Sequence, residues 1–61
     1  MNIQEAILAA DGKPFARAAW GARGYWQDIK GKVQAFWHGN DPVEKFTPSI
    51  ESLLADDWRV L

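Results

Sequence analysis

A chain of 61 residues that contains no cysteine has to obtain its stability from apolar packing or from association with other chains. Disulfide bonds are excluded, and the single histidine, His38, argues against a structural metal. The material for a core is largely aromatic, because the sequence holds four tryptophans, three phenylalanines and one tyrosine. We therefore expect a single domain over residues 1–61, with part of its aromatic surface buried between copies of the chain.

The charge balance limits the kinds of partner that we expect this protein to bind. Seven Lys and Arg residues face eight Asp and Glu residues, and no basic block is present, so a nucleic-acid polymer is not an expected partner. The longest apolar run, Ala6–Ala10, is far shorter than the roughly 20 residues that a membrane span needs. No secretion signal opens the chain. These features predict a cytoplasmic protein that does not enter a membrane.

The first element predicted from the pattern is a helix over residues 3–10. Asn2 can cap its free amides, and the carboxylate of Glu5 can reach back to the cap. One helical face is apolar and consists of Ile3, Ala6, Ile7 and Ala10. Gly12 is expected to take the left-handed conformation after the cap, and Pro14 prevents the helix from continuing.

Strands are expected next. Residues 14–20 follow a Gly/Pro turn without a helix cap, which favours a strand. Residues 25–29 and 32–37 carry aromatic and β-branched side chains on either side of Lys30-Gly31, which is typical of a β-hairpin.

The register of this hairpin depends on the length of its loop. With two loop residues, Trp26 shares a face with Ala35 and Trp37, whereas with three it shares a face with Phe36. The sequence leaves both registers open.

The last third of the chain predicts a loop over residues 39–42, a brief edge strand over 43–46, a second helix and a closing strand over 57–61. Thr47 is expected to cap the helix, with Pro48 at its first position. The apolar face of this helix consists of Ile50, Leu53 and Leu54. The predicted fold class is therefore α+β, a small twisted antiparallel sheet with an N-terminal helix and a short second helix on one face.

Few residues suit catalysis. There is no cysteine nucleophile, and sequence spacing places no partner beside His38. Asp56 and Asp57 are adjacent, so they share neither a helical face nor a strand face. The spacing of these two residues with Asp41 and Glu44 matches no metal-binding loop. We expect neither an enzyme nor a bound metal or cofactor.

The segment from Arg17 to Gly24 has the groups that a nucleotide needs. The indole of Trp20 offers a surface on which a base can stack, at about 1 to 3 kcal/mol per base. Arg17 and Arg23 offer guanidinium groups to phosphates, and Gly21 lets backbone amides come close. In the alternative interpretation Trp20 belongs to the core and both arginines are solvated. For Trp26, Trp37 and Trp58, core packing is the stronger interpretation.

The order of these pieces resembles the small phage proteins of the second Thoeris anti-defence type. The resemblance spans nearly the whole chain and is carried by Glu5-Ala6-Ile7 with Gly12-Lys13, by Arg17-Ala18-Ala19-Trp20, and by Phe46-Thr47-Pro48-Ser49 followed by Leu53-Leu54-Ala55-Asp56-Asp57-Trp58.

The resemblance implies a sponge that holds a cyclic ADP-ribose isomer without cleaving it, in the cytoplasm of an infected bacterium. It also implies a homodimer or homotetramer that keeps the host defence effector inactive. Stacking roles fall on Trp20 and Phe46, and polar contacts on Arg17, Thr47 and Ser49. Two alternatives remain: a cyclic dinucleotide as the ligand, or a protein-interaction module that inhibits a host protein directly.

Overall fold

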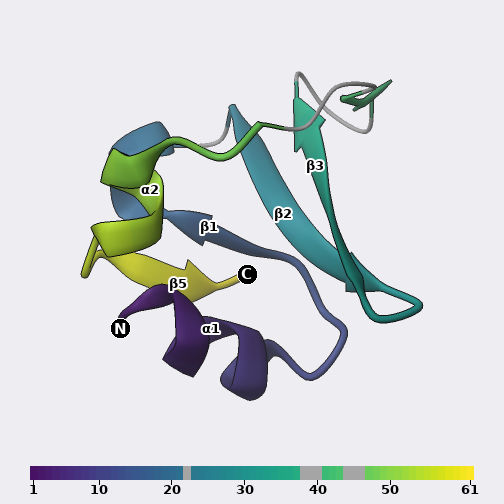
Figure 1. Cartoon of the computed structure of the whole chain (residues 1–61), viewed down its shortest axis with the longest axis horizontal. Helices are drawn as coiled ribbons and strands as arrows, with labels where there is room; N and C mark the ends of the chain where they lie inside the picture. Colours follow the sequence, from purple (N-terminus) through teal and green to yellow (C-terminus); the bar gives the residue numbers. More distant parts are fainter. Residues whose placement is uncertain (22, 38–40, 44–46) are drawn as a thin grey trace.

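The computed structural model describes residues 1–21, 23–37, 41–43 and 47–61 of the chain. Its elements follow in the order α1 (Ile3–Ala10), β1 (Phe15–Arg17), a 3-10 helix η1 (Ala18–Trp20), β2 (Gly24–Ile29), β3 (Lys32–Trp37), β4 (Asp41–Pro42), α2 (Ile50–Leu54) and β5 (Trp58–Val60). The fold is a small α+β domain, as the sequence predicts (Figure 1).

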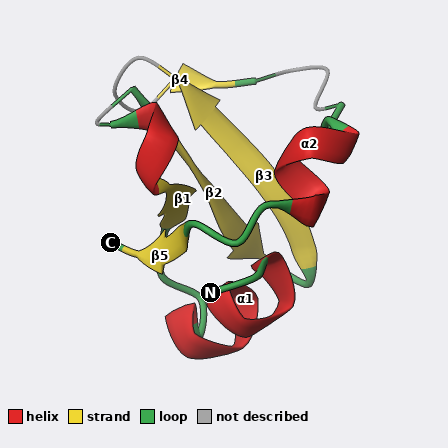
Figure 2. Cartoon of the chain, turned by 90° about the vertical axis from the view of Figure 1, so that its left-hand side faces the viewer, coloured by secondary structure: helices red, strands yellow, loops and turns green. Residues whose placement is uncertain are grey.

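The strands form one antiparallel sheet in the order β4-β3-β2-β1-β5. The last strand of the chain therefore lies beside the first, and Arg17 of β1 stands opposite Trp58 of β5. Both helices lie near β5, with α1 below it and α2 above it in Figure 1, while the β2–β3 hairpin extends to the other side. Figure 2 shows the two helices in front of the long strands.

The start of α1 confirms the predicted cap. The Asn2 side chain accepts a hydrogen bond from the Glu5 amide at 2.8 Å, and the Glu5 carboxylate accepts one from the Asn2 amide at 2.9 Å. The helix ends at Ala10 and Gly12 has a φ of 88°, as predicted, but the left-handed turn begins one residue earlier, because Asp11 already has a φ of 50°. Aspartate tolerates the left-handed region better than most residues, so the turn begins before the glycine.

The hairpin has a two-residue loop. Lys30 and Gly31 both have positive φ, at 54° and 81°, as a type I′ turn requires. The Asp28 carboxylate accepts a hydrogen bond from the Gly31 amide at 2.9 Å and closes the turn. Trp26 consequently pairs with Ala35, which decides between the two registers that the sequence leaves open.

Two strand predictions need correction. The strand predicted over residues 14–20 ends at Arg17, because the next three residues turn into η1. Part of the segment predicted as a loop over residues 39–42 is a strand, since Asp41–Pro42 pairs with β3. Of the edge strand predicted over 43–46, Val43 lies outside any strand, and residues 44–46 are not among those described.

The cap of α2 is Ser49 rather than Thr47. The Ser49 hydroxyl accepts a hydrogen bond from the Ser52 amide at 3.1 Å, and the helix begins at Ile50. Pro48 therefore lies before the cap instead of at the first helical position.

The buried face of α2 also differs from the prediction. Ser52 is buried and its carbonyl accepts a hydrogen bond from the Trp58 indole at 3.0 Å. Ile50 and Leu54 are 70% and 79% exposed, and Leu53 is exposed at 39%. The hydrogen bond from the Trp58 indole to the Ser52 carbonyl fixes the rotation of this short helix, so its apolar side chains point away from the core.

The core lies between the sheet and the two helices. It combines small and large side chains: Ala6, Ala10, Phe15, Trp26, Ala35 and Trp58. The two alanines of α1 let the helix approach the aromatic rings closely, and Phe15 packs on Trp58 with ring centroids 5.6 Å apart. Aromatic packing thus supplies the stability that the sequence cannot obtain from disulfides.

Candidate functional site

Trp20 belongs to a cluster of four indole rings. Its ring centroid lies 5.2 Å from that of Trp58, 5.5 Å from that of Trp26 and 6.3 Å from that of Trp37. Two of these pairs, those with Trp58 and Trp37, meet edge to face. The side chain is half-buried: it packs against the core, as the alternative interpretation predicts, and part of it remains accessible to solvent.

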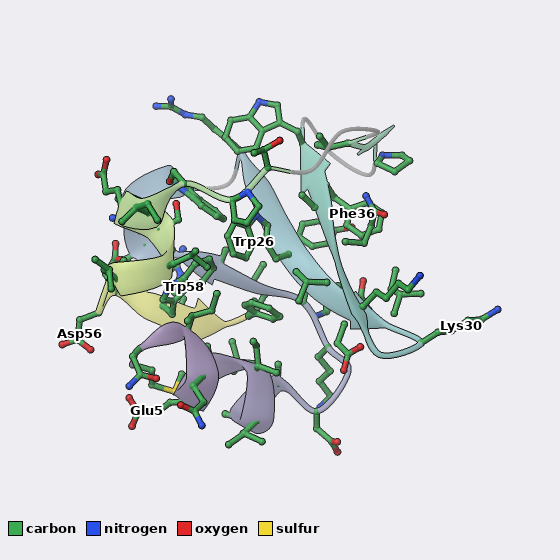
Figure 3. All side chains as sticks on the ribbon, in the orientation of Figure 1. Glu5, Trp26, Lys30, Phe36, Asp56 and Trp58 are labelled. Carbon is green, nitrogen blue, oxygen red and sulfur yellow. The ribbon has the colours of Figure 1, made fainter. Side chains whose placement is uncertain are left out.

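Of the three neighbours of Trp20 in the cluster, two are buried and one is exposed. Trp26 and Trp58 are 7% and 2% exposed, which confirms their prediction as core residues (Figure 3). Trp37 was expected in the core as well, and this is wrong, because the side chain is 38% exposed. It is the last residue of β3 and stands opposite Gly24, where a Cβ would collide with its ring. The glycine opposite a strand-end tryptophan is the signal that could have indicated this position.

Arg17 is engaged within the chain. Its Nε donates a hydrogen bond to Asp57 Oδ1 at 2.8 Å, and its Nη1 lies 3.8 Å from Glu51 Oε1. The side chain is only 14% exposed. Two carboxylates already balance this guanidinium, so it attracts a phosphate less than a lone arginine would.

Arg23 is in a different situation. It is exposed, and within the described residues no carboxylate forms an ion pair with it. Its amide donates to the Trp20 carbonyl at 3.3 Å, which closes a turn over Gly21, and Gly21 has a φ of 62°. Trp20, Gly21 and Arg23 are therefore brought together at one end of the sheet by a turn that favours glycine at its left-handed position.

The predicted site residues after the hairpin are less well supported. Thr47 is exposed and lies three residues before Ile50, where α2 begins. The Ser49 hydroxyl is used in capping, since it accepts from the Ser52 amide and donates to the Ser52 hydroxyl at 3.0 Å. Phe46 lies outside the described residues.

Asp57 is a residue whose importance the sequence does not reveal. Its carboxylate contacts Arg17 through one oxygen and the Ala19 amide through the other, at 3.1 Å. The hydrogen bond from Arg17 lowers the pKa of this carboxyl from its ordinary value, and the Ala19 amide adds to the effect. Its neighbour Asp56 points away from the domain in Figure 3.

The described surface does not provide the usual parts of an active site. Among the residues that the structure describes, no three or more His, Asp or Glu side chains come together as metal ligands, and no pocket is formed. What the residues around Trp20 offer is a partly accessible indole and, in Arg23, an exposed guanidinium with which no described carboxylate forms an ion pair. Such an arrangement can bind a planar anionic molecule by stacking and by charge.

These features define a class of protein: a small α+β domain in which Trp20, Gly21 and Arg23 lie in one turn at the end of the sheet. The chain belongs to the Tad2-like family, described as the Thoeris anti-defense 2-like domain, whose model matches residues 1–61. This membership implies a role against Thoeris defence. Comparison with curated proteins and with solved structures gave no significant match. In the described part of the chain, no helix is long and apolar enough to cross a membrane.

Proposed function

We propose that the protein is a phage-encoded sponge that binds a cyclic ADP-ribose-type immune signal and holds it without cleaving it. The observation that carries the proposal is the match of the Tad2-like family over the whole chain. The surface around Trp20 supports it, because a stacking ring and a cation lie in one turn. A sponge that removes the signal in the cytoplasm of the infected host leaves the defence effector inactive.

The geometry suggests how the roles are divided. Trp20 stacks on the adenine and Arg23 contacts the phosphates, while the amides of Gly21 and Arg23 hold the turn through their bonds to the Ala18 and Trp20 carbonyls. Phe46 and Thr47 retain the roles that the family resemblance gives them, as a second stacking ring and a polar contact. Arg17 and Ser49, which are occupied by Asp57 and Ser52, support the site from within the domain.

We further propose that the protein works as a homodimer or homotetramer. The apolar residues of α2 favour association, since Ile50 and Leu54 are more than two thirds exposed. A net charge of -1 does little to keep copies apart. A ligand shared between subunits would also gain the enclosure that the described part of one chain does not provide.

Isothermal titration calorimetry tests the proposal directly. The purified protein is titrated with a panel of cyclic ADP-ribose isomers and cyclic dinucleotides, and we expect micromolar or tighter binding of at least one cyclic ADP-ribose isomer. The complex is then denatured by heat and the released nucleotide is identified by mass spectrometry. An intact nucleotide supports a sponge, whereas a cleaved one indicates an enzyme.

The same panel separates the alternatives. Binding of cyclic dinucleotides alone would change the ligand but keep the sponge. The exposed apolar face of α2 favours a second candidate, a module that inhibits a host protein by contact. No nucleotide binding, together with co-purification of one host protein in a defined stoichiometry, would favour that candidate over the sponge.

A further inference from the structure

The short helix η1, which ends at Trp20, is held by a residue almost 40 positions away in the sequence. The Ala18 amide donates to the Asp57 carbonyl at 2.9 Å, and the Ala19 amide donates to Asp57 Oδ2 at 3.1 Å. The first amides of a helix have no partner within the helix, and here one backbone carbonyl and one carboxylate of the same residue satisfy two of them. Arg17, at the N-cap position of η1, makes no side-chain capping hydrogen bond. Asp57 therefore supplies the cap from a distant part of the chain.

The second oxygen of the carboxylate holds the strand that leads into η1. Arg17 Nε donates to Asp57 Oδ1 at 2.8 Å, and Asp57 immediately precedes Trp58, the residue of β5 that pairs with Arg17. Arg17 is the residue immediately before η1, so its contact with Asp57 helps to fix the point at which this helix begins. A charged pair of this length, with the arginine 86% covered, restricts the backbone more strongly than an exposed surface pair does.

We propose that Asp57 is a positioning residue that orients the Trp20 indole for ligand binding by fixing η1 on β5 through the Arg17 side chain and the Ala19 amide. This proposal rests on the assignment of Trp20 to the ligand site. Trp20 is the third and last residue of η1, so a rotation of η1 moves its ring relative to Trp58 and Trp26. Arg17 then serves the site by holding Asp57, and it does not touch the ligand.

Two substitutions distinguish positioning from direct contact. Arg17→Gln removes the charged pair but leaves the Ala19 amide bonded to the carboxylate. Asp57→Asn removes the negative charge and leaves one acceptor oxygen instead of two, so it keeps at most one of the two bonds and that bond without its charge. If Asp57 positions Trp20, Asp57→Asn weakens binding more than Arg17→Gln does. If Arg17 instead contacts the phosphates, the order is reversed.

Asp56→Asn is the matched control. The two aspartates are adjacent, each substitution removes one negative charge, and the described residues place no ion pair on the Asp56 side chain. The first readout needs no ligand: the chemical shift of the Trp20 indole N–H and the hydrogen-exchange rate of the Ala19 amide are measured by NMR. We expect Asp57→Asn to shift the indole signal and to speed exchange at Ala19, with no change in Asp56→Asn.

The second readout is calorimetry with cyclic ADP-ribose. We expect Asp57→Asn to weaken binding at least about tenfold, because the fraction of molecules with Trp20 in its binding orientation falls, and Asp56→Asn to stay within about twofold. Unchanged indole and Ala19 signals in Asp57→Asn, or an affinity loss larger in Arg17→Gln, would overturn the proposal. If the unsubstituted protein binds no nucleotide, the sponge is refuted while the NMR measurement still decides whether Asp57 orients Trp20.

Discussion

Because Trp20 is half-buried, we expect it to contribute both to the stability of the domain and to ligand binding. Substitutions that remove different amounts of the ring are needed to measure the two contributions separately. Trp20→Ala removes ring contacts to Trp58, Trp26 and Trp37 together with the exposed stacking surface. A fully buried tryptophan loses about 3 to 5 kcal/mol on truncation to alanine. Since Trp20 is only partly buried, we expect about 2 to 3 kcal/mol, including the edge-to-face contacts.

This loss is large for so short a chain. At about 0.05 to 0.15 kcal/mol per residue, the whole free energy of unfolding is about 3 to 9 kcal/mol. Trp20→Ala should therefore leave a folded but weakened domain, with a melting temperature lower by about 10 to 20 °C. Trp20→Phe keeps a ring in the cluster, and we expect it to lose only about 1 kcal/mol of stability while its smaller face weakens ligand stacking.

Urea denaturation followed by far-ultraviolet circular dichroism measures the stabilities, and calorimetry with cyclic ADP-ribose measures binding of the folded Trp20→Phe variant. Stability of Trp20→Ala within about 0.5 kcal/mol of the unsubstituted protein would refute the packing of this ring in the cluster. Unchanged affinity in Trp20→Phe, measured where the variant is fully folded, would remove Trp20 from the ligand site.

Three further predictions concern other parts of the domain. Because the Asp57 pKa is lowered from 3.8 by its hydrogen bond from Arg17, its stabilisation is present above that pH and is lost as the pH falls through the lowered pKa. Urea titrations between pH 6 and pH 2 should show a smaller decline in Asp57→Asn, and an equal decline would contradict the contact. Gly24→Ala should lower stability by about 1 to 3 kcal/mol in thermal denaturation, since the added methyl collides with a tryptophan ring; a neutral effect would mean that the ring moves aside freely. Ile50→Lys with Leu54→Glu should convert an oligomer to a 6.9 kDa monomer in sedimentation equilibrium while leaving the monomer folded, because both side chains are exposed; a persisting oligomer would exclude the α2 face as the interface.

The parts of the fold that depend on local chemistry could be predicted from the sequence. The capping box of Asn2 and Glu5 is complete within four residues, and it is confirmed. The hairpin around Lys30-Gly31 is confirmed as well, although its register needed the structure, because both loop lengths are compatible with the same residues. The second cap was placed wrongly, since Thr47 and Ser49 are both good caps and only the contact of Trp58 with Ser52 decides between them.

The candidate site could be predicted only in part. The sequence singles out the segment from Arg17 to Gly24, and the structure places Trp20, Gly21 and Arg23 of it in one turn. The engagement of Arg17 could not be foreseen, because its partner Asp57 lies 40 positions further along the chain. In the sequence Asp57 stands out only as half of an adjacent acidic pair that is unsuited to catalysis. Contacts across such a separation arise from topology, which the local pattern does not encode.

The pairing of β1 with β5 has a consequence for the order in which the domain forms. The β2–β3 hairpin joins neighbouring residues and can close in about 1 to 10 µs. The β1–β5 pair closes a loop of some 40 residues, at an entropic cost of about 3 kcal/mol. Trp58 belongs to the core, so we expect docking of the C-terminal strand to be the slow step of folding. Substitutions in β5 should therefore slow refolding more than substitutions in the hairpin.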